Sequence, residues 1–337
     1  MKKLIALLLA ACLMLGLMTT AFAADEKSND IVILYTNDVH CAVDDNIGYA
    51  GLGEESDFFM DGGKQTRAPS KAIVEKNMDG IVATVQGMAA DFTFLQEIDA
   101  GPSTHAYGIE EAGRLRTETQ LDSAHALNYK CAFVPYPIPP IGRVNTGLMT
   151  LSTAPITSAE RIALPSPFKW PVSVANLKRC LMPVYIDLEG TDAQLVLVNL
   201  HLEAYDDGEG KAAQTAALTS FLEQEYAKGN YVIAGGDFNQ TFPGGLDKYP
   251  IKNDDLWTPG MLDDSMLPDG WHFAYDTSVP TCRLDNQPYD AESEATQHYV
   301  IDGFILSPNV ELTSVQTQDD GFRFSDHNPV LLSIRLK

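Results

Sequence analysis

Short apolar runs recur along the chain, and each run ends in polar residues. Such runs predict buried β-strands, and the polar residues that follow them predict loops that carry chemistry. The predicted strands are residues 31–36, 92–95, 195–200, 231–234, 299–301, 304–306 and 329–336.

Two stretches between these strands carry apolar residues at helical spacing. Residues 69–88 form the first, and the second ends before Gly229 and Asn230, which favour a helix stop. Strands alternate with helices, without a Pro/Ser-rich linker or an internal repeat, and this predicts one large α/β domain. Residues 247–297 are rich in Pro, Gly, Asp and Asn, which predicts loops that either cover a site or decorate the surface.

Acidic residues dominate the charge of the chain. Its 337 residues include 23 Lys and Arg against 46 Asp and Glu, which gives a formal net charge of −23. A simple basic patch for a polyanion is therefore excluded, and phosphate must be approached through a metal cation or a few placed donors. The five cysteines form no Cys-x-x-Cys pair and no cluster with histidine along the sequence, which predicts buried free thiols rather than a structural zinc site.

The first 23 residues have the pattern of an export signal. Lys2 and Lys3 precede an apolar run to Met18, and a small-x-small site ends at Ala23. We expect cleavage there and a secreted or extracytoplasmic protein, monomeric and without a stable membrane span. A lipoprotein form through Cys12 is the weaker alternative, because the apolar run continues past that residue.

Acidic residues and histidines stand at or beside the predicted strand ends. Glu97 is suited to a hard cation such as Mg²⁺. Asp302 lies within an apolar strand and needs a partner, because burying an unpaired carboxylate is costly. His327 is the predicted partner, as general base or as hydrogen-bond donor to the transition state. Asp326 is a second candidate metal ligand, and His201 is expected to donate to a phosphoryl oxygen.

Five motifs stand in one order along the chain: Gln96-Glu97, Asn199-Leu-His201, Gly236-Asp-Phe-Asn239, the Asp302 strand, and Ser325-Asp-His327. Together they resemble the endonuclease/exonuclease/phosphatase superfamily, of the deoxyribonuclease I type, over about residues 46–337. The resemblance implies a four-layer α/β/β/α sandwich. It also implies hydrolysis of phosphomonoester or phosphodiester bonds with Mg²⁺, or else Mn²⁺ or Ca²⁺.

The resemblance also implies individual roles. Glu97 and Asp326 would bind the metal, while Asp237 and Asn239 would orient the attacking water and hold the phosphate. These two side chains share one side of their turn if the backbone there stays extended. Asn145 is a candidate substrate contact. The substrate itself is left open among small phosphoesters, lipid head groups and nucleic acid.

The amino end departs from this resemblance. Asn46 matches the superfamily's first-strand asparagine, yet residues 31–52 resemble the opening of exported 5′-nucleotidases, with Asp38 and His40 as the matching motif. We therefore divide the chain into a signal peptide (1–23), a nucleotidase-like fragment that supplies a first strand (24–45) and the catalytic domain (46–337). On this interpretation Asn37 stands where Asn46 normally would.

Two alternatives follow from this departure. A catalytically impaired pseudoenzyme or binding protein would keep the sandwich without the first-strand asparagine. A true 5′-nucleotidase is less favoured, because the further motifs of its two-metal site do not occur after residue 52. A nuclease would need a cationic track, for which the chain offers only scattered candidates: Lys64, Arg67, Lys71, Lys178 and Arg179.

Overall fold

The computed structural model describes residues 30–38, 67–135, 138, 140–170, 173, 177–205, 208–285 and 289–337. The predicted signal peptide and Asn46 lie outside these residues, and only the backbone of residues 30–38 is described. In the described part, no helix is long and apolar enough to cross a membrane.

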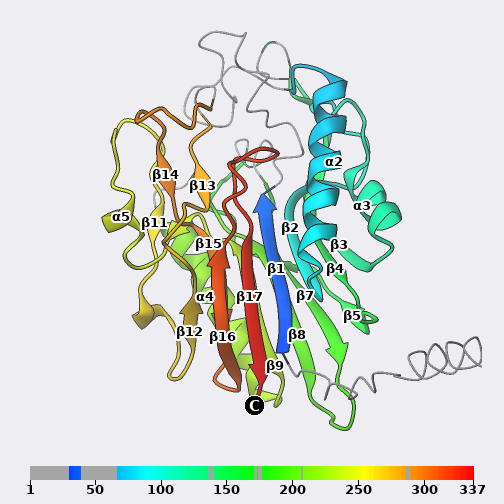
Figure 1. Ribbon diagram of the computed structural model, residues 1–337, viewed down its shortest axis with the longest axis vertical. Coiled ribbons are helices and arrows are strands. Elements are labelled where there is room, and N and C mark those ends of the chain that lie inside the picture. Colours follow the sequence, from blue (N-terminus) through cyan, green and yellow to red (C-terminus); the bar gives the residue numbers. More distant parts are fainter. Residues whose placement is uncertain are drawn as a thin grey trace, which may run out of the picture.

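Two large β-sheets form the centre of the molecule (Figure 1). The six-stranded sheet has the order β16 (Val310–Thr317), β17 (Val330–Leu336), β1 (Asp30–Asp38), β2 (Phe92–Asp99), β4 (Gly142–Ser152) and β3 (Asp122–Val134). The seven-stranded sheet has the order β12 (His272–Ala274), β15 (Asp302–Leu306), β9 (Tyr231–Asp237), β8 (Gln194–His201), β7 (Cys180–Asp187) and β5 (Ser158–Ala159), and β6 (Ile162–Ala163) also pairs with β7.

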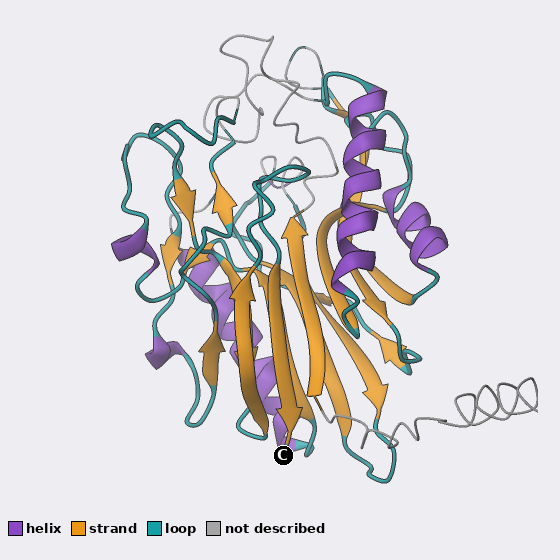
Figure 2. Ribbon diagram, in the orientation of Figure 1, coloured by secondary structure: helices purple, strands orange, loops and turns teal. Residues whose placement is uncertain are grey.

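Helices cover the outer face of each sheet (Figure 2). Helices α2 (Lys71–Met88) and α3 (Glu111–Thr119) pack on the six-stranded sheet, and α4 (Glu209–Ala227) packs on the seven-stranded sheet. The smaller elements are β10 (Gln240–Thr241), α5 (Gly245–Lys248), β11 (Gly260–Met261), η4 (Asp264–Met266), β13 (Cys282–Arg283) and β14 (His298–Tyr299). The predicted four-layer α/β/β/α sandwich is therefore confirmed.

The alternation of side chains along β8 shows how the layers are held together. Leu195 and Leu197 point into the core between the two sheets, which also includes Phe94 of β2 and Leu332 of β17. The alternate side chains of β8 pack against α4 instead. Both faces of the strand are buried in this way, which explains its continuous apolar sequence.

The predicted elements correspond closely to those observed. The strand expected at residues 31–36 forms as β1, antiparallel to β17 and parallel to β2, and so occupies a central position. The helix expected at residues 69–88 forms as α2, whose first turn is capped by the Ser70 hydroxyl. The sequence pattern did not reveal β3 or β16, because each is an edge strand with many half-exposed or exposed positions.

Gly236 allows β8 and β9 to approach closely. Its φ angle is 151°, and a Cβ atom there would lie 2.0 Å from the Leu200 carbonyl oxygen. We expect Gly236→Ala to destabilise the fold by roughly 2 kcal/mol or more, because backbone must move. Urea unfolding measures the change. Gly87→Ala is the control, since nothing lies within 4 Å of a Cβ there and the helix should gain up to about 1 kcal/mol. Equal midpoints for Gly236→Ala and wild type would contradict the close approach.

Candidate active site

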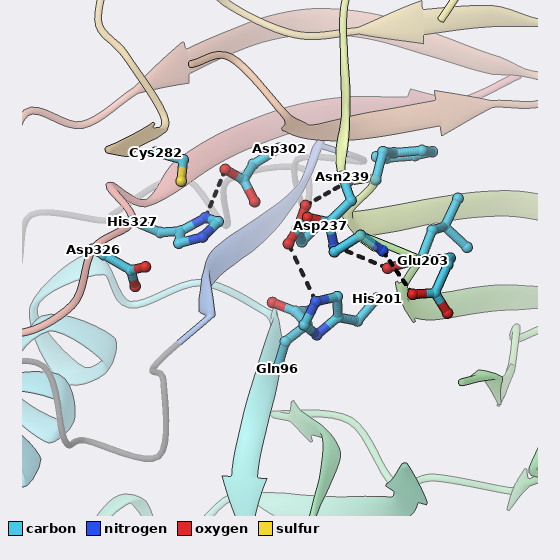
Figure 3. Close-up of polar contacts among 12 residues, drawn as sticks. Gln96, His201, Glu203, Asp237, Asn239, Cys282, Asp302, Asp326 and His327 are labelled. Carbon is cyan, nitrogen blue, oxygen red and sulfur yellow. Dashed lines mark hydrogen bonds and ion pairs between the residues drawn. The ribbon is translucent and has the colours of Figure 1, made fainter. Parts of the chain in front are cut away.

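Three strand ends meet at one edge of the seven-stranded sheet. His201 ends β8, Asp237 ends β9 and Asp302 begins β15, and sheet pairing aligns Asp237 with both neighbours. All three residues are buried. Figure 3 shows these side chains with His327 beside Asp302. The fold thus brings together four of the predicted catalytic residues.

Asp302 and His327 form the predicted pair. The Asp302 Oδ2 lies 2.9 Å from the His327 Nδ1, and both side chains are buried. The backbone N–H of Asp302 donates to the Thr281 hydroxyl at 3.2 Å, and that of His327 donates to the Ser325 hydroxyl at 3.0 Å. Both partners are therefore held in place by backbone hydrogen bonds. The carboxylate fixes the orientation of the ring and leaves its Nε2 for chemistry.

Asp237 lies between His201 and Asn239. Its Oδ2 is 3.3 Å from the His201 Nε2, and its Oδ1 accepts the backbone N–H of Asn239 at 2.7 Å. The Asn239 side chain donates to the Leu202 carbonyl at 2.9 Å. The expected extended backbone is wrong, because Asn239 has a left-handed φ of 49° and the segment forms an Asx turn. The turn still holds Asp237 and Asn239 at the same strand end (Figure 3).

Burial and negative charge set the protonation of this cluster. Burial, and then the charge of Asp302, raise the pKa of Asp237 to about 7, although His327 and Arg179 oppose the shift. Burial lowers the pKa of His327, but Asp302, Cys282 and Asp326 together raise it well above its usual value. The Asp302 and Asp326 carboxylates therefore favour the protonated form of the His327 ring.

Asp326 and Glu97 are the predicted metal ligands. Asp326 is 1% exposed, and among the described residues its Oδ2 has no hydrogen-bond partner. Such an orphaned buried oxygen fits a cation ligand. Glu97 is half-buried at a β-bulge in β2, with a left-handed φ of 52°. A residue of this type rarely adopts that conformation, and such outliers gather at functional sites.

The neighbouring motif residues connect the two sheets. The Gln96 side chain donates to the Asn199 Oδ1 at 2.6 Å, and the Asn199 amide donates to the Met149 carbonyl at 2.9 Å. These bonds run from β8 to β2 and β4, across the sandwich. Asn199 therefore holds the end of β2, with Glu97, close to the end of β8.

Arg179, one of the scattered candidates for a cationic track, is buried instead. It is only 4% exposed and directly precedes β7. Among the described residues, its Nε and Nη1 have no hydrogen-bond partner. Its charge lowers the pKa of Asp237, so the guanidinium lies close to the acidic cluster. The sequence pattern that could have predicted this burial is an arginine directly followed by the apolar run of β7.

The three asparagines predicted to bind substrate have different outcomes. Asn46 lies outside the described residues, and of Asn37 only the backbone in β1 is described. Asn145 lies in β4, where its backbone N–H donates to the Ser103 hydroxyl at 2.9 Å and its side chain packs against Gly101. These contacts place Asn145 beside the loop after β2, and its contact with substrate stays a prediction.

Comparison with known proteins agrees with this geometry. A profile of the Endonuclease/Exonuclease/phosphatase family matches residues 68–327, which is most of the chain. The chain belongs to this family. Its membership makes it a hydrolase of the phosphoesterase type, in a family whose enzymes generally use divalent metal ions. A search of curated proteins found no match.

Solved structures of the family share the fold. The endonuclease/exonuclease/phosphatase from Beutenbergia cavernae superposes with a TM-score of 0.60 at 18% identity, covering 91% of this chain and 72% of that one. Truncated Caenorhabditis elegans TDP2 superposes with a TM-score of 0.53 at 14% identity, covering 91% of this chain and 98% of that one. The human Nocturnin catalytic domain, solved with a bound sulfate anion, superposes with a TM-score of 0.52 at 13% identity, covering 91% of this chain and 94% of that one. The 5′-nucleotidase origin of residues 31–52 stays a prediction.

The raised pKa of Asp237 predicts how stability depends on pH. The native state binds this proton more tightly than the unfolded state, so stability falls as pH rises from about 4 towards 7. In EDTA at pH 8, Asp237→Asn should be more stable than wild type by about 1 kcal/mol or more, and the gain should vanish near pH 4. Urea unfolding measures both values, with exposed Asp192→Asn as the control. A gain that is independent of pH would refute the assignment.

Proposed function

We propose that the protein is an exported, Mg²⁺-dependent phosphoesterase that cleaves phosphomonoester or phosphodiester bonds by in-line attack of water. The observation that carries the proposal is the buried Asp302–His327 pair, placed beside Asp237 at the strand ends. A histidine oriented by a carboxylate, next to a second acid, suits proton transfer during hydrolysis. Export is proposed from the sequence pattern of residues 1–23.

Glu97 and Asp326 are the residues that would hold the metal. The orphaned Asp326 oxygen fits this role, because Mg²⁺ prefers one or two carboxylates together with water and substrate phosphate. When bound, the ion offsets the negative charge that develops on the phosphoryl oxygens.

The other residues divide the remaining work. Asp237 accepts a hydrogen bond from the attacking water, and Asn239 beside it holds a phosphoryl oxygen. His201, which contacts Asp237, donates to a non-bridging oxygen. His327 exchanges the proton, and Asp302 keeps its ring oriented.

Arg179 supplies a fixed positive charge for the phosphate. A guanidinium offers several donors in a rigid plane and matches phosphate oxygens two at a time. Burial excludes water from this contact and so strengthens it. A substrate anion would accept hydrogen bonds from the Arg179 Nε and Nη1, which have no hydrogen-bond partner among the described residues.

The net charge of −23 favours a small phosphoester or a lipid head group as substrate. A long nucleic acid would lie along an acidic surface and be repelled beyond the few phosphates near the site. Arg179 is buried, so it cannot belong to a surface track of basic residues that would bind nucleic acid.

Hydrolysis of a substrate panel tests the proposal. Mature protein should hydrolyse at least one of bis(4-nitrophenyl) phosphate, sphingomyelin, nucleotides and DNA, and EDTA should abolish the reaction. His327→Gln should lower kcat by about 100-fold or more, since it removes the proton-transfer group. His272→Gln, in the short strand β12, is the matched control and should retain activity. No hydrolysis of any substrate with Mg²⁺ would instead indicate the impaired pseudoenzyme.

The role of Arg179 is tested separately. Arg179→Met should lower kcat/KM by about 100-fold, because a charged hydrogen-bonding partner of the phosphate is lost. Arg179→Lys should recover only part of the loss, since lysine cannot bind two oxygens in one plane. Arg335→Met on the surface of β17 is the control. Wild-type kcat/KM in Arg179→Met would exclude the contact.

A further inference from the structure

A cysteine lies beside the proposed catalytic histidine. Cys282 begins β13 and pairs with His327 through an isolated antiparallel bridge. The Cys282 Sγ, a carboxylate oxygen of Asp326 and a ring nitrogen of His327 lie within 4.8 Å of one another. All three residues are buried, and Figure 3 shows them together at one side of the site. The sequence showed no such Cys/His cluster, because 45 positions separate the two residues along the chain.

Each of the three side chains has a donor atom suited to a metal. Among the described residues the Asp326 Oδ2 has no hydrogen-bond partner, and Asp326 is 1% exposed. The Cys282 thiol donates to the carbonyl oxygen of its neighbour Arg283 at 3.3 Å, and it also forms a side-chain hydrogen bond with His327. The His327 Nδ1 is taken by Asp302, so the Nε2 is the nitrogen that can coordinate.

The surroundings of His327 also suit coordination. Histidines that bind metals usually donate their second ring N–H to a carboxylate, which fixes the ring and makes the coordinating nitrogen more basic. Asp302 provides such a carboxylate at 2.9 Å. Ligands of one Zn²⁺ ion lie about 2.0–2.3 Å from it, so at the tetrahedral angle two of them stand roughly 3.3–3.8 Å apart. The three donor atoms lie within 4.8 Å of one another, so they would have to approach by up to roughly 1 Å to bind one ion.

We propose that Cys282, Asp326 and His327 form a binding site for a thiophilic divalent cation, of which Zn²⁺ is the representative, and that this site shares Asp326 with the proposed Mg²⁺ site. Sulfur and imidazole donors favour Zn²⁺, while Mg²⁺ takes oxygen ligands. Three protein ligands leave one position for water. On binding, the Cys282 thiol and the Nε2 of the His327 ring each release a proton to solvent; the thiolate and the neutral imidazole then bind the cation, with no change of oxidation state.

Occupancy of this site inhibits the enzyme. The bound ion takes the His327 nitrogen that hydrolysis requires and one carboxylate of the proposed Mg²⁺ site. This inhibitory consequence rests on the proposed function, whereas the binding of the cation does not. Burial raises the pKa of the Cys282 thiol to about 12.

Cobalt spectroscopy of the full chain tests the binding directly. Co²⁺ added to wild-type protein should produce a stoichiometric thiolate-to-metal charge-transfer band, which oxygen ligands alone cannot produce, and added Zn²⁺ should remove it. Cys282→Ser should lack the band. Cys180→Ser, at a buried thiol that contacts Asn128, should keep it. The site is overturned if wild type shows no band, or if Cys282→Ser retains it.

Inhibition is measured with the same proteins on bis(4-nitrophenyl) phosphate or another active substrate in Mg²⁺. Zn²⁺ should inhibit the wild-type enzyme. The Zn²⁺ concentration that halves activity should be at least about tenfold higher for Cys282→Ser, because one ligand is lost. Equal sensitivity of the two proteins would overturn the inhibitory role. A cobalt band without any hydrolysis would overturn the proposed function alone, and hydrolysis without a band would overturn the zinc site alone.

Discussion

Buried negative charge at the ends of β9 and β15 is the constraint on which the site depends. Asp237 and Asp302 are paired residues of neighbouring strands, and both are buried. Burial, and then the repulsion from Asp302, raise the pKa of Asp237 to about 7. Such a pair persists only with positive charge nearby, and His327 and Arg179 supply it within the described residues. A cation held by Asp326 and Glu97 would offset the remaining negative charge.

The sandwich supplies the rigidity that this arrangement requires. Sheet pairing sets the spacing of His201, Asp237 and Asp302, and the core between the sheets fixes the strands that carry them. The Thr281 and Ser325 hydroxyls accept hydrogen bonds from the backbone N–H groups of Asp302 and His327, respectively. The acids therefore cannot separate to relieve their repulsion, and the energy of that repulsion is available to bind cations.

The sequence predicted the central strands and most of the site, because apolar runs with polar ends reveal buried strands directly. It failed where the signal is not local. The burial of Arg179 was not predicted, because Pro183 weakens the strand pattern of β7, which directly follows the arginine. The left-handed turn at Asn239 and the contact of Cys282 with His327 depend on tertiary packing, which spacing along the chain cannot show.

Hydrolysis in ¹⁸O-labelled water tests the central claim most directly. If this acidic cluster directs water onto phosphorus, bis(4-nitrophenyl) phosphate turned over in H₂¹⁸O should give 4-nitrophenyl phosphate that carries the label and 4-nitrophenol that does not. Label in the phenol would show attack at carbon and contradict the account, as would the absence of any Mg²⁺-supported turnover across the substrate panel.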